Sequence, residues 1–520
     1  MSVLVGHSDA PSHATGASFP GFGEDAPLEL PSTLTSSALL ARLLDGSHEA
    51  FADTLATVGN CAHPIRLTGS SQTVDAATGE IISSFASDAM PLGELYVSCG
   101  NRRAHICPAC SRTYARDTFE LIRSGVVGGK TVPTTVAACP LLFVTLTAPS
   151  FGLVHGLRPN GGQCRPRSSD RVVTCPHGVR LSCNARHGDD DALVGAPLCF
   201  ECYDWTSAVV WQFHAPELWR RTTTAVRRAL ASRLGVSEGK LRERCTVQFA
   251  KVAEYQARGA IHFHALIRLD GPDGPGSPCP FDAEALAGAV ALAAGVTTVM
   301  APPAFETDTA RVLAWGAQLD VKTISHGHRD LTSSDDLTPE QVAGYLAKYA
   351  TKDATDLRTV GERPHLVRLA DECRDLARHA HERSIRRALK GDDATVVPVD
   401  AKTGLDHYAL VGKWVHMLGF RGHFSTKSRR FSITLGKLRA ARARYRRLVE
   451  HSQRTGIPLD TRNLEARLLA DDDDTETTLV VGSWEYAGTG WPKPGDPALA
   501  LAAAARAREY DQWRATRPAF

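Results

Sequence analysis

The stretch from Ala260 to Leu269 (AIHFHALIRL) constrains this chain more than any other. It is short, apolar and rich in strand-forming residues, which predicts a buried β-strand. Side chains alternate between the two faces of a strand, so His262 and His264 point to one face and Phe263 points to the other. Two imidazoles placed in this way are half of a metal site.

The preceding residues supply a third ligand candidate. Val247–Tyr255 predicts a second strand, and Ala257–Gly259 predicts a three-residue hairpin loop with glycine in its left-handed position. Pairing outward from this loop sets Glu254 opposite His262, on the face of both histidines. The resulting N/O ligand set suits Mg²⁺ or Mn²⁺, with positions left open for a substrate. Gln256 shares this face and is the alternative ligand.

Length and composition set broad limits. A chain of 520 residues has room for two or three domains, and 43% hydrophobic with 22% charged residues is ordinary for a soluble protein. We find no apolar run of about 18 residues, which predicts no membrane span. Residues 1–30 lack the basic start and apolar core of a secretory signal, so we expect a cytoplasmic protein.

The chain has 13 cysteines, and nine of them lie from Cys99 to Cys202; all of these except Cys139 fall largely in short-spaced groups. In a reducing compartment this clustering predicts structural zinc, with two four-cysteine sites or one site and spare residues. The candidate ligands, whose pairing the spacing leaves open, are Cys99, Cys107, Cys110, Cys164, Cys175, Cys183, Cys199 and Cys202. A redox dithiol is the alternative for Cys107 and Cys110 alone. The remaining five are expected to be ordinary small residues: Cys61, Cys139, Cys245, Cys279 and Cys373.

Two further elements accompany the histidine strand. Leu141–Pro149 predicts a strand that ends at a proline, so the cysteine groups bracket a core strand. Thr338 and Pro339 predict a helix start. Tyr345 and Tyr349 are four residues apart in this helix and share one face. Lys348 and Lys352 each follow a tyrosine by three residues; taken alone, this stripe is typical of a half-buried helix surface.

The order of these motifs is more informative than any one of them. A Phe-x-Thr-Leu-Thr strand (143–147), a His-x-His strand (262–264) and a Tyr-x-x-Lys-Tyr helix (345–349) together resemble the HUH endonucleases, which nick single-stranded DNA. Four segments look like the replication initiators of actinobacterial rolling-circle and integrative plasmids: 99–103, 107–110, 145–152 and 420–428. This resemblance covers roughly residues 95–450.

The resemblance implies a specific reaction. A tyrosine attacks a scissile phosphodiester and leaves a 5′-phosphotyrosine and a free 3′-OH, assisted by a divalent ion on His262, His264 and Glu254. Tyr349 matches the shared nucleophile position, and Tyr345 is its twin or a positioning residue. Lys348 or Lys352 would favour the phenolate or clamp a phosphate. The partners implied are single- and double-stranded origin DNA, with host helicase, polymerase and single-strand binding protein, since we find no phosphate-binding GxxxxGK[ST] loop.

The segment Lys413–Arg447 holds eleven Lys/Arg, no acidic residue and several aromatic residues. This pattern predicts DNA contact, while a solvated basic helix is the alternative for its second half. The DNA-binding candidates are Arg421, Lys427, Arg429 and Arg430.

The predicted fold class is α+β, with an antiparallel HUH nuclease sheet of about five strands, flanking helices and a cysteine-rich zinc-binding insertion. The predicted organisation is a largely disordered segment with a possible helix over 1–58, a cysteine-rich region over 59–235, the nuclease core over 236–360, a basic DNA-contacting region over 361–470, and a linker and tail over 471–520. A two-tyrosine transposase or conjugative relaxase is the alternative within this chemistry. A non-catalytic, zinc-structured DNA-binding regulator is the alternative from another class.

Overall fold

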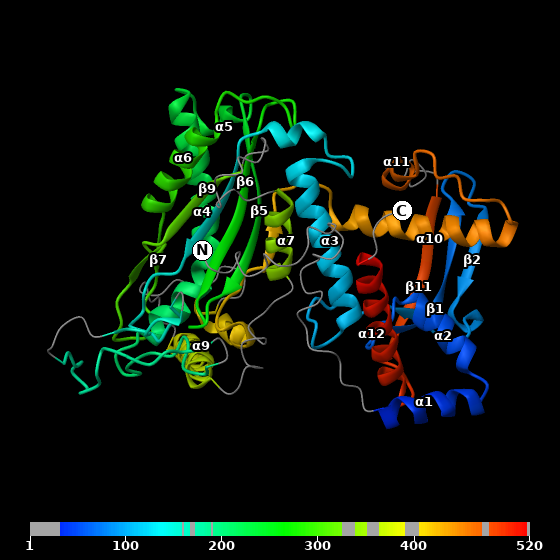
Figure 1. Ribbon diagram of the computed structural model, residues 1–520, viewed down its shortest axis with the longest axis horizontal. Helices are drawn as coiled ribbons and strands as arrows, with labels where there is room; N and C mark the ends of the chain where they lie inside the picture. Colours follow the sequence, from blue (N-terminus) through cyan, green and yellow to red (C-terminus); the bar gives the residue numbers. More distant parts are fainter. Residues whose placement is uncertain are drawn as a thin grey trace.

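The computed structural model describes residues 32–158, 161–166, 172–188, 191–324, 339–350, 363–390, 405–470 and 478–516. It combines α-helices with antiparallel β-sheets, so the predicted α+β class is confirmed. One sheet of five strands forms the centre of the molecule, and a smaller sheet joins segments from the two ends of the chain (Figure 1).

The central sheet has the strand order β10-β5-β6-β4-β9, and every neighbouring pair is antiparallel. Its strands are β4 (Leu141–Thr147), β5 (Thr246–Tyr255), β6 (Ile261–Asp270), β9 (Leu319–Thr323) and β10 (Ser425–Lys427). The predicted histidine strand is β6, which lies in the middle of the sheet as expected. Its near-continuous burial explains why its sequence is apolar on both faces.

Helices cover both faces of this sheet (Figure 1). The face of Phe263 packs against α4 (Trp205–Arg233) and α6 (Ala283–Val296). The opposite face, from which both histidines project, packs against α3 (Pro108–Val127) and α7 (Pro339–Ala350). Because α7 is the predicted tyrosine helix, the fold brings it to the face that carries the histidines.

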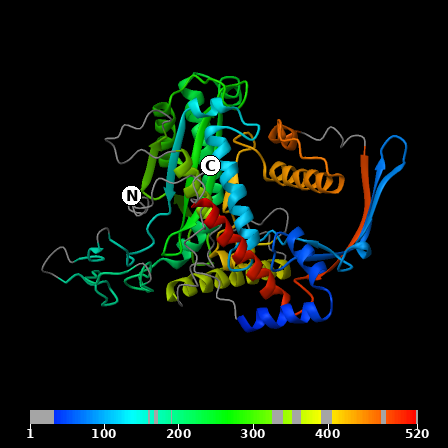
Figure 2. The same cartoon turned by 45° about the vertical axis from the view of Figure 1, so that its right-hand side comes forward.

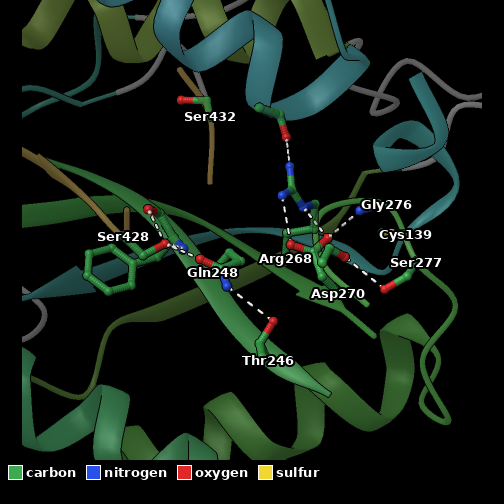
Figure 3. A network of polar contacts seen from close by, with 12 residues as sticks. Cys139, Thr246, Gln248, Arg268, Asp270, Gly276, Ser277, Ser428 and Ser432 are labelled. Carbon is green, nitrogen blue, oxygen red and sulfur yellow. Dashed lines mark hydrogen bonds and ion pairs between the residues drawn. The ribbon is translucent and has the colours of Figure 1, made fainter. Parts of the chain in front are cut away.

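A buried polar network fixes the end of the sheet that is distant from the histidines (Figure 3). Arg268 donates from Nε to Asp270 Oδ1 and from Nη2 to Asp270 Oδ2, each at 2.8 Å, and also donates to the carbonyl of Gly125 in α3. On β5, Gln248 accepts a hydrogen bond from Ser428, next to β10, at 2.7 Å. These contacts tie β5, β6, β10 and α3 together.

The smaller sheet has the order β11-β1-β2, with β3 also paired to β1, and stands apart from the central sheet (Figure 2). Its strands are β1 (Ile65–Asp75), β2 (Ile81–Ala86), β3 (Leu95–Val97) and β11 (Thr478–Thr489). Where one possible helix was expected within residues 1–58, the structure has two, α1 (Ser32–Leu44) and α2 (His48–Thr57), separated by a turn at Asp45 and Gly46. Glycine with φ +69° accounts for the break.

The remaining elements complete the chain. They are α5 (Glu238–Leu241), β7 (Thr298–Ala301), β8 (Arg311–Ala314), α9 (Pro364–Lys390), α10 (Leu435–Thr455), α11 (Leu464–Leu469), α12 (Asp496–Ala515) and the 3₁₀ helices η1 (Ser87–Ala89), η2 (Thr134–Ala138) and η4 (Ala409–Met417). None of the described helices is both long enough and apolar enough to cross a membrane.

The segment 148–204, between β4 and α4, is built differently. Its described residues form no α-helix and no β-ladder, and their backbone pairing is limited to isolated bridges: Val154 with Pro197, Arg165 with Cys183, and Thr174 with Arg180. The segment extends to the lower left of the molecule in both views (Figures 1 and 2). We call it the cysteine-rich arm.

Candidate metal centre and tyrosine helix

Three side chains meet on the α3/α7 face of the central sheet. Glu254 Oε2 lies 2.8 Å from His262 Nε2 and 3.0 Å from His264 Nε2. The three ligand atoms lie within 4.8 Å of one another, a spacing that suits coordination of a single metal ion. Two imidazole nitrogens and a carboxylate oxygen form a mixed N/O donor set for a divalent cation.

The hairpin between β5 and β6 produces this convergence. Glu254 pairs directly with His262, and the Gln256 amide donates to the Ala260 carbonyl at 2.8 Å, as the three-residue loop predicts. Gly259 has φ +78°, the left-handed conformation that the loop requires. A shift of one residue would turn Glu254 to the opposite face, so this turn determines whether the trio exists.

The surroundings of Glu254 and His264 lower the pKa of both side chains. Burial would raise the pKa of the Glu254 carboxyl, but the hydrogen bonds with His262 and His264 outweigh it and lower that pKa to about 2. Burial lowers the pKa of His264, whose side chain is only 5% exposed. An ionised carboxylate beside a neutral imidazole is the state in which both groups bind a cation.

Strand β4 holds the ring of His264 in place. The hydroxyl of Thr145 lies 3.0 Å from His264 Nδ1, and the ring of Phe143 stacks on the imidazole with centroids 5.6 Å apart and planes 6° apart. When a metal ion binds, Thr145 can accept the Nδ1 proton, which leaves the lone pair on Nε2 for the ion in place of the hydrogen bond to Glu254. The two named residues of the Phe-x-Thr pattern therefore both hold the imidazole of His264 in position.

Helix α7 brings a tyrosine to the trio. Its residues Val342, Ala343, Leu346 and Ala347 are buried against the sheet, which orients the adjacent face of the helix. Tyr345 Oη lies 3.4 Å from His264 Nε2, and the two rings meet edge to face with centroids 5.2 Å apart.

The other residues of the tyrosine motif are less completely described. Lys348 and Tyr349 lie in α7, within its final turn, but their side chains are outside the described part of the structure. Lys352 is also outside the described residues. Tyr349 follows Tyr345 by four residues, so its Cα lies on the same side of α7.

The rival ligand Gln256 is engaged elsewhere. Its side-chain oxygen accepts a hydrogen bond from Arg258 Nε at 2.8 Å. Arg258 also donates to the carbonyls of Pro149 and Ala148, at 2.8 and 2.9 Å. Gln256 therefore helps to anchor the hairpin loop, whereas Glu254 faces the histidines.

The structure gathers Cys61, Cys99, Cys107 and Cys110 into a first cysteine cluster, which corrects the expectation that Cys61 is an ordinary small residue. The sulfurs of Cys61 and Cys107 lie 3.8 Å apart. Zinc–sulfur bonds of about 2.3 Å in a tetrahedron place sulfurs about 3.8 Å apart. The cluster joins the loop after α2, the segment that follows β3 and the start of α3.

The cysteine-rich arm contains two further clusters, each of which includes histidine. One holds His155, Cys164, Cys183 and His187; the other holds Cys175, His177, Cys199 and Cys202. The described residues thus contain three clusters in place of the one or two all-cysteine sites that were expected. All eight predicted cysteines belong to a cluster. His155 and His187 were not predicted, because the prediction rested on cysteine spacing; His187 follows Cys183 by four residues, whereas His155 precedes Cys164 by nine.

The predicted DNA-binding residues surround β10, which pairs with β5 at the edge of the central sheet. Arg421, Arg429 and Arg430 are exposed. Lys427 instead donates from Nζ to the carbonyl of Ser432 at 2.8 Å, and burial lowers its pKa to about 8. Its ammonium group therefore holds the loop that carries Arg429 and Arg430.

Comparison with known proteins adds a family to this geometry. A family model described as "RepSA: Replication initiator protein, pSAM2" matches residues 47–505. The chain belongs to this family of replication initiator proteins. The initiator is also 40% identical over 483 residues to a replication initiator protein of Streptomyces ambofaciens, covering 91% of this chain and 94% of the relative. No solved structure matches it.

Proposed function

We propose that this initiator is a metal-dependent, site-specific single-strand DNA endonuclease and ligase of the HUH type, which nicks a plasmid origin through a tyrosine of α7. The observation that carries the proposal is the distance of 3.4 Å between Tyr345 Oη and His264 Nε2, which joins a phenol to a convergent His-His-Glu set. Family membership and the order of the three motifs support the same reaction.

The proposed step is a transesterification that needs no oxidant or nucleotide. The tyrosine oxygen bonds to phosphorus, the bond from phosphorus to the 3′ oxygen breaks, the phenol loses its proton to solvent, and the 3′ oxygen gains one. The phosphotyrosine conserves the bond energy, so attack by a 3′-OH reverses the step and closes the DNA. The released 3′-OH is the primer for rolling-circle synthesis.

The chain must help the phenol to react. A phenol with a pKa of about 10 is ionised in roughly one part in a thousand at pH 7, a deficit of about 4 kcal/mol. A Mg²⁺ or Mn²⁺ ion held by Glu254, His262 and His264 would polarise the scissile phosphate and offset its developing charge. Lys348 and Lys352 are proposed to favour the phenolate or to clamp a phosphate.

The two tyrosines have different assignments. Tyr349 matches the nucleophile position of the HUH motif, so we propose it for the first cleavage. Tyr345 either performs the second transfer or positions the phosphate, and its contact with His264 is compatible with both roles. Loss of the adduct in Tyr349→Phe would assign the first cleavage to Tyr349, whereas an adduct that moves to Tyr345 would show that either tyrosine can attack.

The proposed DNA path follows the edge of the sheet at β10. Because β10 pairs with the strand that carries Glu254, the exposed Arg421, Arg429 and Arg430, which flank β10, lie beside the sheet that holds the metal centre. Phosphate contacts by these residues would make binding weaken steeply with salt. We further propose that the cysteine clusters hold structural zinc, that the protein acts in the cytoplasm, and that host helicase, polymerase and single-strand binding protein extend the nick.

An adduct assay tests the proposal. The full-length protein is incubated with labelled single-stranded origin DNA and Mn²⁺ or Mg²⁺, and an SDS-resistant adduct is expected. Tyr349→Phe should abolish the adduct, or move it wholly to Tyr345 if the pair is redundant. His262→Ala should weaken nicking but leave binding to duplex origin intact. Tyr510→Phe, which alters an exposed tyrosine of α12, is the matched control and should leave the adduct unchanged.

The same assay addresses the alternatives. A zinc-structured regulator would bind the origin and leave no adduct with either metal ion. A transposase or relaxase would form the adduct at the ends of a mobile element or at a transfer origin, and would leave the replication origin uncut.

A further inference from the structure

The described residues of the cysteine-rich arm form no separate apolar core, and its buried Phe151 and Tyr203 pack into the main core instead. Many of its other apolar side chains are exposed, among them Leu153, Leu157, Val172, Val173, Val179 and Leu193. Its described residues form only isolated backbone bridges. Small units that cannot bury enough apolar surface are commonly held together by bound metal or by disulfides, and every cysteine of the arm is a free thiol. Metal binding is therefore the interaction that can order the arm.

The cluster formed by His155, Cys164, Cys183 and His187 has the geometry of a zinc site. His155 Nδ1 lies 3.2 Å from His187 Nε2, and Cys183 Sγ lies 3.5 Å from His187 Nε2. Tetrahedral zinc with bonds of about 2.0–2.3 Å places such ligand atoms about 3.3–3.8 Å apart. Sulfur and imidazole ligands in this number favour zinc over Mg²⁺ or Ca²⁺.

The surroundings of this cluster support the same assignment. Asp191 Oδ2 lies 2.6 Å from His187 Nδ1, the carboxylate–histidine arrangement that orients imidazole ligands of zinc. The amide of Gly156 donates to Cys164 Sγ at 3.2 Å, a contact that stabilises a thiolate. The side chain of His187 is 1% exposed, so its ring is held inside the arm.

The backbone of one ligand connects this cluster to the hairpin of the metal centre. The His155 amide donates to the Ala196 carbonyl at 2.8 Å, and the Gly195 amide donates to the His155 carbonyl at 2.9 Å. Gly195 has φ +91°, and a Cβ there would lie 2.2 Å from the carbonyl carbon of Ala257. The arm thus packs directly against the β5–β6 turn, three residues beyond Glu254.

We propose that a zinc ion bound by His155, Cys164, Cys183 and His187 stabilises the position of the β5–β6 turn, and through this turn the alignment of Glu254 with His262. The role assigned to Glu254 and His262 rests on the proposed function, whereas the zinc site and its contact with the turn do not. Loss of this ion would free the backbone of residues 194–196, which His155 holds by two hydrogen bonds and which packs against Ala257 of the turn.

The test measures zinc content and hydrogen exchange in the full-length protein. Cys183→Ser should lose one zinc equivalent per chain by elemental mass spectrometry, and the amides of Gln256 and Gly259 should exchange faster. Gly195→Ala should speed the same exchange while zinc content stays at the wild-type value. Cys139→Ser, which alters a cysteine outside the clusters, should change neither quantity.

Three results would overturn the proposal without reference to nicking. Unchanged zinc content in Cys183→Ser would refute the zinc site. Zinc loss with unchanged hydrogen exchange at the turn would refute its effect on the β5–β6 turn. If Cys183→Ser does not fold, Asp191→Asn replaces it, with zinc affinity expected to fall about 10- to 100-fold in a chelator competition. An unchanged affinity would contradict the assignment. A wild-type protein that forms no DNA adduct would refute the proposed function and leave these readouts intact.

Discussion

The hydroxyl of Thr145 lies 3.0 Å from Nδ1 of His264, on the side of the imidazole opposite the contact with Glu254. Outer contacts of this kind orient a metal-binding ring and select its tautomer. The threonine belongs to β4 and the histidine to β6, and the two residues pair directly across the sheet. Strand pairing therefore determines how the candidate ligand presents its second nitrogen.

Thr145→Val keeps the shape of the side chain and removes this oxygen. We expect affinity for Mn²⁺ to fall about 10- to 100-fold, because the ring of His264 loses its orientation. Titration of the protein with Mn²⁺ by calorimetry measures the effect. Thr145→Ser, which restores the hydroxyl, should recover most of the affinity; equal affinity in the valine variant and the wild type would show that the contact is unimportant.

The first cysteine cluster predicts a specific metal loss. Cys61→Ser should remove one zinc equivalent per chain, because it takes one of four ligands from the site that joins α2, β3 and α3. The matched control is Cys245→Ser, since Cys245 is buried but belongs to no cluster among the described residues. Zinc content that is equal in the two variants would contradict a metal site at Cys61.

Lys251 makes stability depend on pH. It is buried over the ring of Phe263, with Nζ 4.2 Å from the centroid, and burial lowers its pKa from 10.5 to about 7. Between these two pKa values the unfolded chain binds a proton that the folded chain lacks, so the free energy of unfolding rises with pH across this window. Below about pH 7 the lysine is charged in both states, and the full cost of burying its charge reduces stability.

Lys251→Met should therefore raise the free energy of unfolding at pH 7 by on the order of 2–4 kcal/mol and should flatten its rise toward pH 9.5. Urea unfolding at several pH values measures both effects. Lys413→Met, which alters an exposed lysine, should leave the pH dependence unchanged. A Lys251→Met protein that is less stable than the wild type at pH 7 would contradict this account.

Arg268 and Asp270 form a buried pair, with exposures of 0% and 1%. Asp270→Asn leaves a buried guanidinium without its counter-charge, so we expect a loss of roughly 3–5 kcal/mol in the free energy of unfolding. Asp273→Asn in the following exposed loop is the control, with an expected change below about 0.5 kcal/mol. Similar unfolding midpoints for the two variants would show that the pair does not support the fold.

Local signals explain which features the sequence predicts well. Gly259 fixes the hairpin loop, and the alternation of side chains then places Glu254 and His262 on one face, so both the register and the trio follow from a dozen residues. The central position of β6 follows from its burial on both sides. Each of these features depends on neighbours in the sequence.

Features that depend on distant partners are missed for a physical reason. Strand β11 pairs with β1 from the opposite end of the chain, and no local pattern marks that pairing. Cys61 lies 38 residues before Cys99, outside any short spacing. His155 and His187 become partners only through the backbone path of the arm. The domain boundaries expected from composition remain predictions, although β11 and α12 show that the tail contributes to the smaller sheet and its helices.

The most direct test of the central claim is mass-spectrometric mapping of the residue that is covalently joined to nicked origin DNA. The full-length protein is reacted with single-stranded origin DNA and Mn²⁺, digested, and searched for a peptide that carries a nucleotide. We predict a 5′-phosphotyrosine in the peptide that contains Tyr345 and Tyr349, and no such peptide from His264→Ala. A nucleotide attached to any residue outside α7, or efficient nicking with no attached peptide, would contradict the account.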